Sequence, residues 1–185
     1  MTSAASDYWD PLWADGRRYR PLTGPETTLL DQHLGPGDQR LALDLGCGSG
    51  ALARHLHHLG YRTTAVDCSP AALALAAEHG DVPDLVFQQL DIETDDLTAL
   101  PHCAYSLITC RLVYAFIHDK AAFLDRVRAL LAPGGCLWIC TPLASRLETR
   151  KEIGITDTEA EQLLSGWSSA HTHPLDTLNC YALHP

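Results

Sequence analysis

Three glycines at alternate positions are the first residues in this 185-residue sequence whose type and spacing could serve a ligand. Gly46, Gly48 and Gly50 follow the apolar run 41–45 and precede a stretch of helical spacing at 51–59. Glycine lets a backbone adopt positive φ and approach a ligand closely, because it has no Cβ. Open α/β sheets bind ligands beyond the carboxyl ends of their strands, where this loop would lie. The pattern therefore predicts a cofactor site.

The glycine loop alone leaves two cofactor classes open. Gly46-x-Gly48-x-x-Ala51 also satisfies the dinucleotide fingerprint, so an NAD-dependent Rossmann oxidoreductase remains an alternative. Asp44 precedes the loop, where a carboxylate would repel a pyrophosphate but would suit an ammonium group. This acid favours a cofactor with a cationic end.

Two further acids follow the next two expected strands. Asp67 stands 21 positions after Gly46, where a carboxylate can accept hydrogen bonds from both hydroxyls of a ribose, which fits either cofactor. The pair Asp91-Ile92 could hold an adenine, with the carboxylate on the exocyclic amine and isoleucine against the ring. The alternative for Asp91 is a solvated acidic loop, since further acids follow it.

The elements that would position these residues alternate along the chain. We expect helices around 25–34 and at 51–59, 70–79, 119–131 and 156–164, after an irregular, aromatic-rich start. We expect strands at 41–45, 63–66, 85–90, 104–110, 136–141, 168–174 and 178–183. Such alternation implies an α/β fold with a mostly parallel sheet and helices on both faces.

The composition limits the classes of partner. With 13 basic and 23 acidic residues the formal net charge is −10, which argues against nucleic acid or an anionic membrane as the main partner. No apolar run reaches the roughly 20 residues that span a bilayer, and the first residues do not resemble a signal peptide, so we expect a cytoplasmic protein. The seven cysteines include no Cys-x-x-Cys pair and are interpreted as reduced thiols, several of them buried.

Four segments in this order resemble the motifs of class I S-adenosylmethionine-dependent methyltransferases. They are Leu43-Asp44-Leu45-Gly46-Cys47-Gly48-Ser49-Gly50, Val66-Asp67-Cys68-Ser69-Pro70, Leu90-Asp91-Ile92 and Leu130-Leu131-Ala132-Pro133-Gly134-Gly135. The resemblance covers about residues 40–142. It implies a Rossmann-like, seven-stranded, mostly parallel sheet with the last strand antiparallel, and S-adenosylmethionine as cofactor with S-adenosylhomocysteine as product.

The resemblance also implies which residues bind the cofactor. The glycine loop would carry its methionine end, Asp67 the ribose, and Asp91 with Ile92 the adenine. The residues expected to contact the cofactor are Asp44, Gly46, Cys47, Gly48, Gly50, Asp67, Cys68, Asp91, Ile92, Arg111, Trp13 and Tyr19.

The candidates for catalysis follow the fourth expected strand. Methyl transfer requires an aligned acceptor and, for some acceptors, a base. His118 is the best base by chemistry, while Arg111 and Tyr114 could contact cofactor or substrate. Many small-molecule relatives have a histidine where this sequence has Phe116. This difference weakens the assignment of a general base by resemblance to the family. His118 could instead be an exposed residue at a helix start, and Arg111 a structural ion-pair partner.

The N-terminal aromatic residues could form a lid. Trp13 and Tyr19 are the first choices, because aromatic rings exclude water and attract a sulfonium, but a hydrophobic strap over the sheet edge is equally open. We expect one domain, 1–185, with a helical lid segment (1–39), a cofactor-binding core (40–142) and a last helix with two strands (143–185).

These observations predict a methyltransferase that acts on O, N or S of a small molecule. Little of the chain is left for a substrate domain, although a peptide or a carrier-bound intermediate could reach an open site. A SAM-binding protein with another reaction or a partner role is the second alternative. The histidines at 55, 57, 58, 171 and 173 lack a third nearby ligand, so no metal site is expected. The protein would be a monomer or homodimer.

Overall fold

The structure is a computed structural model that describes residues 3–185, so residues 1 and 2 of the expected lid segment lie outside the described residues. The chain forms two compact units, of which the first ends at Cys103 and the second runs from Ala104 to Pro185. The expected organisation as one domain, with internal boundaries at 39 and 142, stays a prediction.

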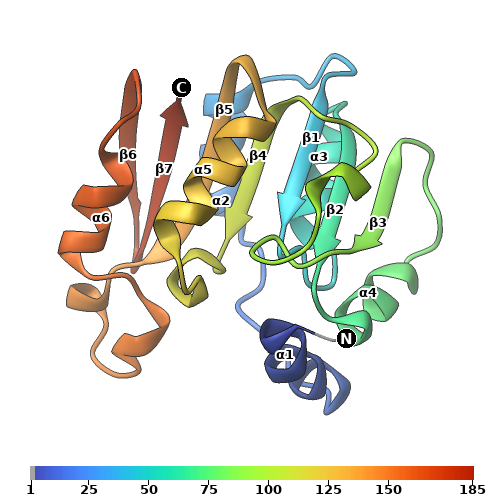
Figure 1. Cartoon of the computed structure of the whole chain (residues 1–185), viewed down its shortest axis with the longest axis horizontal. Coiled ribbons are helices and arrows are strands. Elements are labelled where there is room, and N and C mark those ends of the chain that lie inside the picture. Colours follow the sequence, from blue (N-terminus) through green and yellow to red (C-terminus); the bar gives the residue numbers. More distant parts are fainter. Residues whose placement is uncertain (1–2) are drawn as a thin grey trace. The chain divides into compact units, whose positions relative to one another are not determined.

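The first unit is built on three parallel strands (Figure 1). Its elements are α1 (Ala4–Ala14), α2 (Gly24–Leu34), β1 (Leu41–Leu45), α3 (Ala51–His58), β2 (Arg62–Asp67), α4 (Pro70–Ala77), β3 (Leu85–Gln89) and the short 3-10 helix η1 (Leu97–Ala99). β2 pairs in parallel with both β1 and β3. The carboxyl ends of the three strands therefore meet at one edge, where the loops that follow them lie together.

Local sequence explains where the helices of this unit begin and end. The Ser69 hydroxyl accepts the Ala72 N–H at 3.1 Å, and Pro70 occupies the first helical position of α4. α2 begins with a capping box between Thr23 and Glu26. α4 ends at Ala77, two residues before the end that the sequence predicted.

The prediction of an irregular N-terminus is wrong for Ala4–Ala14, which form helix α1. The hydroxyl of Ser3 accepts the Ser6 N–H at 3.1 Å and caps the helix. Trp9 and Trp13 are four residues apart and therefore share one face of the helix. Pro11 obscured this pattern because proline inside a helix removes a backbone donor and is normally read as a break.

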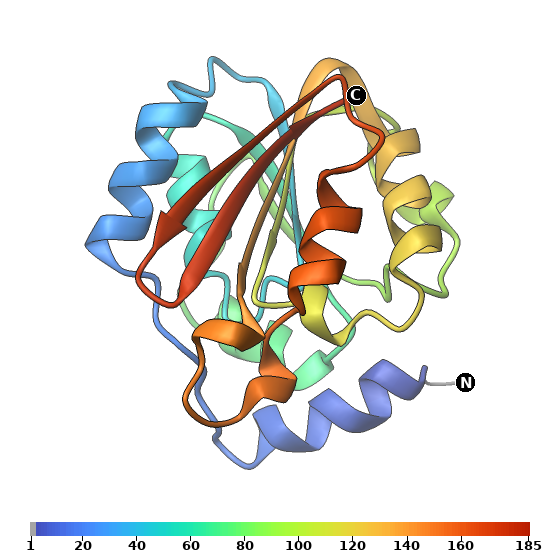
Figure 2. The ribbon, with the colours of Figure 1, turned by 90° about the vertical axis from the view of Figure 1, so that its left-hand side faces the viewer.

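The second unit contains the remaining strands. Its elements are β4 (Tyr105–Arg111), η2 (Tyr114–Phe116), α5 (Lys120–Leu130), β5 (Leu131–Pro142), η3 (Ala144–Arg146), η4 (Lys151–Ile153), α6 (Asp157–Leu164), β6 (Ser169–Leu175) and β7 (Leu178–His184). β4 and β5 are parallel, whereas β7 is antiparallel to both β5 and β6. Figure 2 shows the β6–β7 hairpin, coloured red, with α6 beside it.

The expected fold class is confirmed. The strand order is β3-β2-β1-β4-β5-β7-β6, and only β7 runs antiparallel, so the two C-terminal strands complete a Rossmann-like sheet. β5 begins at Leu131, five residues before its predicted start, because the Pro133-Gly134-Gly135 turn continues into the strand. A Cβ at Gly135 would lie 3.0 Å from the carbonyl oxygen of Tyr105, so only glycine allows this close approach.

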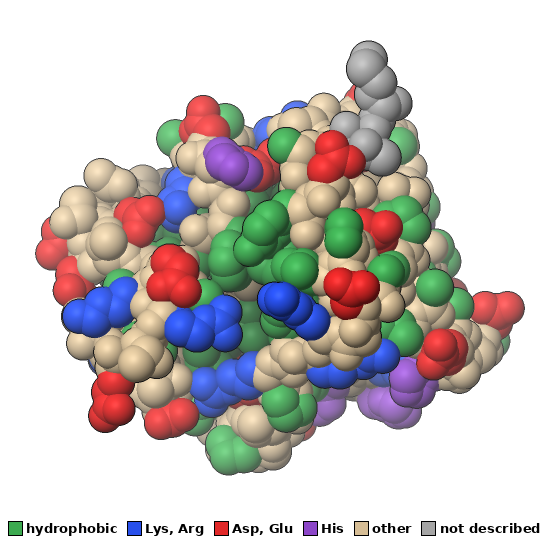
Figure 3. Space-filling model, turned by 90° about the horizontal axis from the view of Figure 1, so that it is seen from below, with side chains coloured by type: hydrophobic (Ala, Val, Ile, Leu, Met, Phe, Trp, Pro, Cys, Tyr) green, Lys and Arg blue, Asp and Glu red, His purple; other side chains and the backbone are tan. Residues whose placement is uncertain are grey.

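Acidic side chains are scattered among basic and apolar ones on the face in Figure 3. Among the described residues, no helix is both long and apolar enough to cross a membrane. All seven cysteines carry thiols rather than disulfides, and four of them, Cys110, Cys136, Cys140 and Cys180, are buried.

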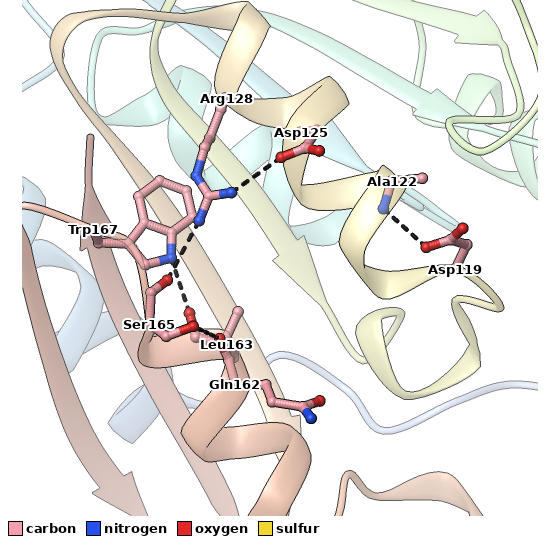
Figure 4. Close-up of polar contacts among 8 residues, drawn as sticks. All are labelled: Asp119, Ala122, Asp125, Arg128, Gln162, Leu163, Ser165 and Trp167. Carbon is pink, nitrogen blue, oxygen red and sulfur yellow. Dashed lines mark hydrogen bonds and ion pairs between the residues drawn. The ribbon is translucent and has the colours of Figure 1, made fainter.

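A side-chain clamp joins α5 to the segment after α6 (Figure 4). The Arg128 guanidinium lies 4.3 Å from the centroid of the Trp167 ring and donates to the Ser165 carbonyl oxygen at 3.4 Å. The Trp167 indole N–H donates to the Leu163 carbonyl oxygen at 2.9 Å, which fixes the ring under the guanidinium. The clamp thus combines a cation–π contact with two hydrogen bonds to backbone carbonyl oxygens.

We expect Arg128→Ala to lower the free energy of unfolding by about 1–2 kcal/mol, since it removes the cation–π contact and a hydrogen bond. Urea denaturation measures this loss. Asp125→Ala is the control, because the Asp125 side chain is 80% exposed and its ion pair with Arg128 is screened, so a change within about 0.5 kcal/mol is expected. Equal losses in both variants would contradict the clamp.

Candidate active site

The glycine loop of the first unit has the geometry that its sequence predicted. Gly48 and Gly50 have φ values of +54° and +81°, and Gly50 is the N-cap of α3. A Cβ at Gly48 would lie 2.9 Å from Cζ2 of Trp13, and one at Gly50 would lie 2.7 Å from the Phe87 ring. Both conformation and space therefore require glycine at these two positions.

The Asp67 carboxylate holds this loop to the next one. It ends β2, is 7% exposed, and accepts the Gly48 N–H on Oδ2 at 2.8 Å and the Ser69 N–H on Oδ1 at 2.9 Å. Burial raises the pKa of Asp67, and these two backbone donors oppose that rise. Each carboxylate oxygen has a second lone pair, so Asp67 can still accept hydrogen bonds from ligand hydroxyls.

The thiols of Cys47 and Cys68, beside this loop, lie close to buried carboxylates. Asp44 is 2% exposed and Asp91 is 6% exposed. Burial raises the pKa of Cys47 well above its usual range, and the charges of Asp44 and Asp67 raise it further. Burial, with Asp67 and Asp91, raises the pKa of Cys68 to about 12. Both thiols stay protonated at neutral pH, so the local charge is that of the carboxylates and favours a cation.

The pair that follows β3 is buried rather than solvated. Asp91 accepts the Glu93 N–H at 2.9 Å, and its own N–H donates to Oδ2 of Asp95 at 2.8 Å. Ile92 is 7% exposed. The solvated-loop alternative therefore does not describe Asp91, and a carboxylate next to an apolar side chain remains suited to an adenine.

Helix α1 docks on the same edge of the first unit through Asp10. Its Oδ1 accepts the Ser69 hydroxyl and the Ala71 N–H, both at 2.8 Å, at the N-terminus of α4. A carboxylate there satisfies an otherwise unpaired helical donor and complements the helix dipole. Sequence reasoning missed Asp10, since no spacing rule relates residues about 60 positions apart.

The expected aromatic pair lies on this docked segment. Trp13 packs over the glycine loop and contacts Tyr19, with ring centroids 4.9 Å apart. Tyr19 also contacts Trp9 at 5.7 Å and is 38% exposed. The first unit thus brings Trp13 and Tyr19 together beside the loop, as a lid would require.

The catalytic candidates lie in the second unit, between β4 and α5. Arg111 is the last residue of β4 and is half-buried. Tyr114 is 1% exposed and packs against Phe123, with Lys120 Nζ 5.7 Å from its ring centroid. Burial raises the pKa of Tyr114, which makes it a poor base at neutral pH. His118 is exposed at the start of α5.

A polar chain in the second unit was not anticipated from the sequence. Arg146 Nη1 donates to Asn179 Oδ1 at 2.9 Å, and Asn179 Nδ2 donates to the Tyr181 hydroxyl at 3.1 Å. Asn179 is 5% exposed and lies opposite Thr141, whose buried hydroxyl has no hydrogen-bond partner. Strand register, which a single sequence does not reveal, brings Asn179 and Thr141 together.

Within residues 3–185 no group of three or more histidine, cysteine or acidic residues is arranged to hold a metal ion. Two histidines of α3 have other partners. His55 lies 2.6 Å from an Asp31 carboxylate oxygen, and His57 lies 2.9 Å from the Pro83 carbonyl oxygen.

Comparisons with known proteins agree with this geometry. A family model described as a methyltransferase domain matches residues 43–137, which include the glycine loop and all three acids. The ubiquinone biosynthesis O-methyltransferase of Albidiferax ferrireducens is 29% identical over 141 residues, 74% of this chain and 55% of that protein. The same-named protein of Xanthomonas oryzae pv. oryzae is 30% identical over 143 residues, 76% of this chain and 58% of that protein. The chain thus spans under two thirds of these relatives.

Solved structures show the same fold. A SAM-dependent methyltransferase from Aquifex aeolicus superposes with a TM-score of 0.70 at 16% identity, covering 89% of this chain and 91% of the other. One from Mesorhizobium loti gives 0.68 at 18% identity, covering 85% and 96%. The plantazolicin methyltransferase, solved in complex with SAH, gives 0.63 at 15% identity, covering 78% and 76%.

We expect Asp10→Ala to loosen α1, because it removes both contacts to the N-terminus of α4. Hydrogen exchange of the amides in α1 should become faster, and the free energy of unfolding should fall by about 1 kcal/mol. Asp15→Ala, at the C-cap that follows α1, is the matched control and should leave exchange unchanged. Unchanged exchange in Asp10→Ala would show that other contacts hold the helix.

Proposed function

This chain belongs to the methyltransferase domain family, and from that premise we propose that it transfers the methyl group of S-adenosylmethionine to O, N or S of a small-molecule acceptor. The observation that carries the proposal is the buried Asp67 carboxylate, which joins the glycine loop to the turn before α4. It stands where a carboxylate can accept hydrogen bonds from ribose hydroxyls.

The donors and acceptors of the first unit fit this cofactor. Asp44 would face the ammonium group, Asp67 the ribose, and Asp91 with Ile92 the adenine. The glycine backbone of residues 46–50, with Cys47, would line the methionine end, and Cys68 would also contact the cofactor. Trp13 and Tyr19 would exclude water and attract the sulfonium through their ring faces. When bound, the cofactor supplies an electrophilic methyl group on a cationic sulfur.

The protein's own part in the reaction is positioning. The leaving group is a neutral thioether, so no acid is needed, and the acceptor must be held in line with the methyl carbon. A base is required only where the acceptor must lose a proton. We propose His118 for that role, because it is exposed and an imidazole nitrogen can accept a proton. Arg111 would contact cofactor or acceptor, and the buried Tyr114 would shape the site.

For the methyl acceptor, the cellular location and the oligomeric state, we propose only a general class. The names of the relatives favour an oxygen acceptor on a small molecule, and a peptide or a carrier-bound intermediate would appear as an alternative hit in an acceptor panel. We propose that the protein acts in the cytoplasm, as a monomer or a homodimer.

Titration calorimetry with S-adenosylhomocysteine tests the cofactor site. Asp67→Ala should weaken binding by about 1–3 kcal/mol, since charge-assisted hydrogen bonds are lost. Asp81→Ala, an exposed acid of the same unit, is the control and should bind normally. Unchanged affinity in Asp67→Ala, or tight binding of NAD without binding of S-adenosylhomocysteine, would contradict the proposal.

Turnover measurements test the base. If His118 removes the acceptor proton, His118→Ala should lower turnover by about 10²- to 10⁴-fold while the affinity for S-adenosylhomocysteine stays unchanged. His79→Ala, an exposed histidine after α4, should keep full turnover. Full turnover in His118→Ala would show that His118 is only an exposed residue at the start of α5.

A further inference from the structure

Two cysteines face each other across the middle of the second unit. In the antiparallel pairing of β5 with β7, Cys140 lies directly opposite Cys180. Their Sγ atoms are 2.7 Å apart, and the two residues are 3% and 2% exposed. No other pair of cysteines occupies opposite positions in the strand pairings of this unit.

This placement meets the geometric demands of a disulfide. Residues directly opposite each other in an antiparallel pair have Cα atoms about 4.5–5.5 Å apart, and disulfides span about 4.4–6.8 Å between Cα atoms. A disulfide bond is about 2.05 Å long, so the sulfur atoms need to approach by only about 0.7 Å.

We propose that Cys140 and Cys180 form a redox-active dithiol that a hydroperoxide converts into a cross-strand disulfide. One thiol, as its thiolate, attacks a peroxide oxygen, breaks the O–O bond and becomes a sulfenic acid. The second sulfur then attacks the sulfenic sulfur and displaces water. In total, two thiols and one hydrogen peroxide give one disulfide and two water molecules, so each sulfur loses one electron and the peroxide gains two.

The place of this pair in the sheet gives the oxidant a route. β6 pairs only with β7 and stands at the end of the strand order, so β7 is one strand from the sheet edge. Edge hairpins open locally more readily than central strands, and such opening exposes buried thiols. Cys136, four residues earlier on β5, lacks an opposed cysteine, and burial raises its pKa to about 11. Cys136 therefore serves as the control for a buried cysteine of the same strand that has no partner for a disulfide.

The bond would have a mechanical consequence for the second unit. It would close a loop from residue 140 to residue 180 that contains η3, η4, α6 and β6. Cross-linking residues far apart in sequence restricts the unfolded chain, so the oxidised protein should melt at a higher temperature than the reduced one. This inference rests on strand register and does not depend on the proposed methyl transfer.

Thiol counting after oxidation tests the proposal. The folded protein is treated with hydrogen peroxide, quenched, denatured and alkylated, and the intact mass is measured. Five of the seven thiols should be alkylated, against seven without oxidant, and dithiothreitol should restore all seven. Seven alkylated thiols after oxidation, or oxidation only to sulfinic and sulfonic acids, would overturn the proposal.

Matched variants identify the bonded pair. After treatment with hydrogen peroxide, all six remaining thiols of Cys180→Ser should still be alkylated. Cys136→Ser should lose two of its six thiols to the disulfide. The Cys136→Ser variant is needed because Cys136 and Cys140 lie in one tryptic peptide, 129–146. If Cys180→Ser fails to fold, peptide mapping of the oxidised Cys136→Ser protein decides by itself. A bridge that involves any other cysteine, such as the exposed Cys103, would contradict the assignment.

Discussion

The buried carboxylate of Asp67 is the interaction on which the cofactor edge of the first unit depends. It accepts N–H groups from two loops that follow different strands, and so fixes the positions of Gly48 and Ser69 together. Gly48 and Ser69 are both buried, and a buried N–H without a hydrogen-bond partner is costly. Ser69 in turn caps α4 and contacts Asp10 of α1, so loop, helix and docked segment share one anchoring point.

The same carboxylate illustrates what the sequence could predict. The sequence placed Asp44, Asp67 and Asp91 at the ends of successive expected strands, and the resemblance to class I methyltransferases implied their roles. The structure places each acid near the end of β1, β2 or β3. Helix starts such as Ser69-Pro70 were also predictable, because capping is a local interaction. These features need only short-range rules and the known geometry of a parallel sheet.

Contacts between residues distant in sequence were not predictable. Asp10 reaches the N-terminus of α4, and Trp13 reaches Gly48, yet nothing in the spacing of these residues relates them. The register of β7 on β5 likewise decides that Cys140 meets Cys180, since a slip of one residue would turn these side chains to opposite faces. The catalytic role of the connection between β4 and α5 stays a prediction. Phe116 departs from the family pattern, and Tyr114 packs as a core residue.

The docking of α1 also affects how much binding energy a ligand keeps. A helix that is already docked has lost its conformational freedom before the ligand binds. The entropy cost of ordering the helix therefore does not reduce the affinity for the ligand. If only a fraction of molecules held the helix in place, the apparent dissociation constant would rise by the reciprocal of that fraction. Asp10 would then set affinity without touching the ligand, and natural variation at this position would tune occupancy while the pocket itself stays the same.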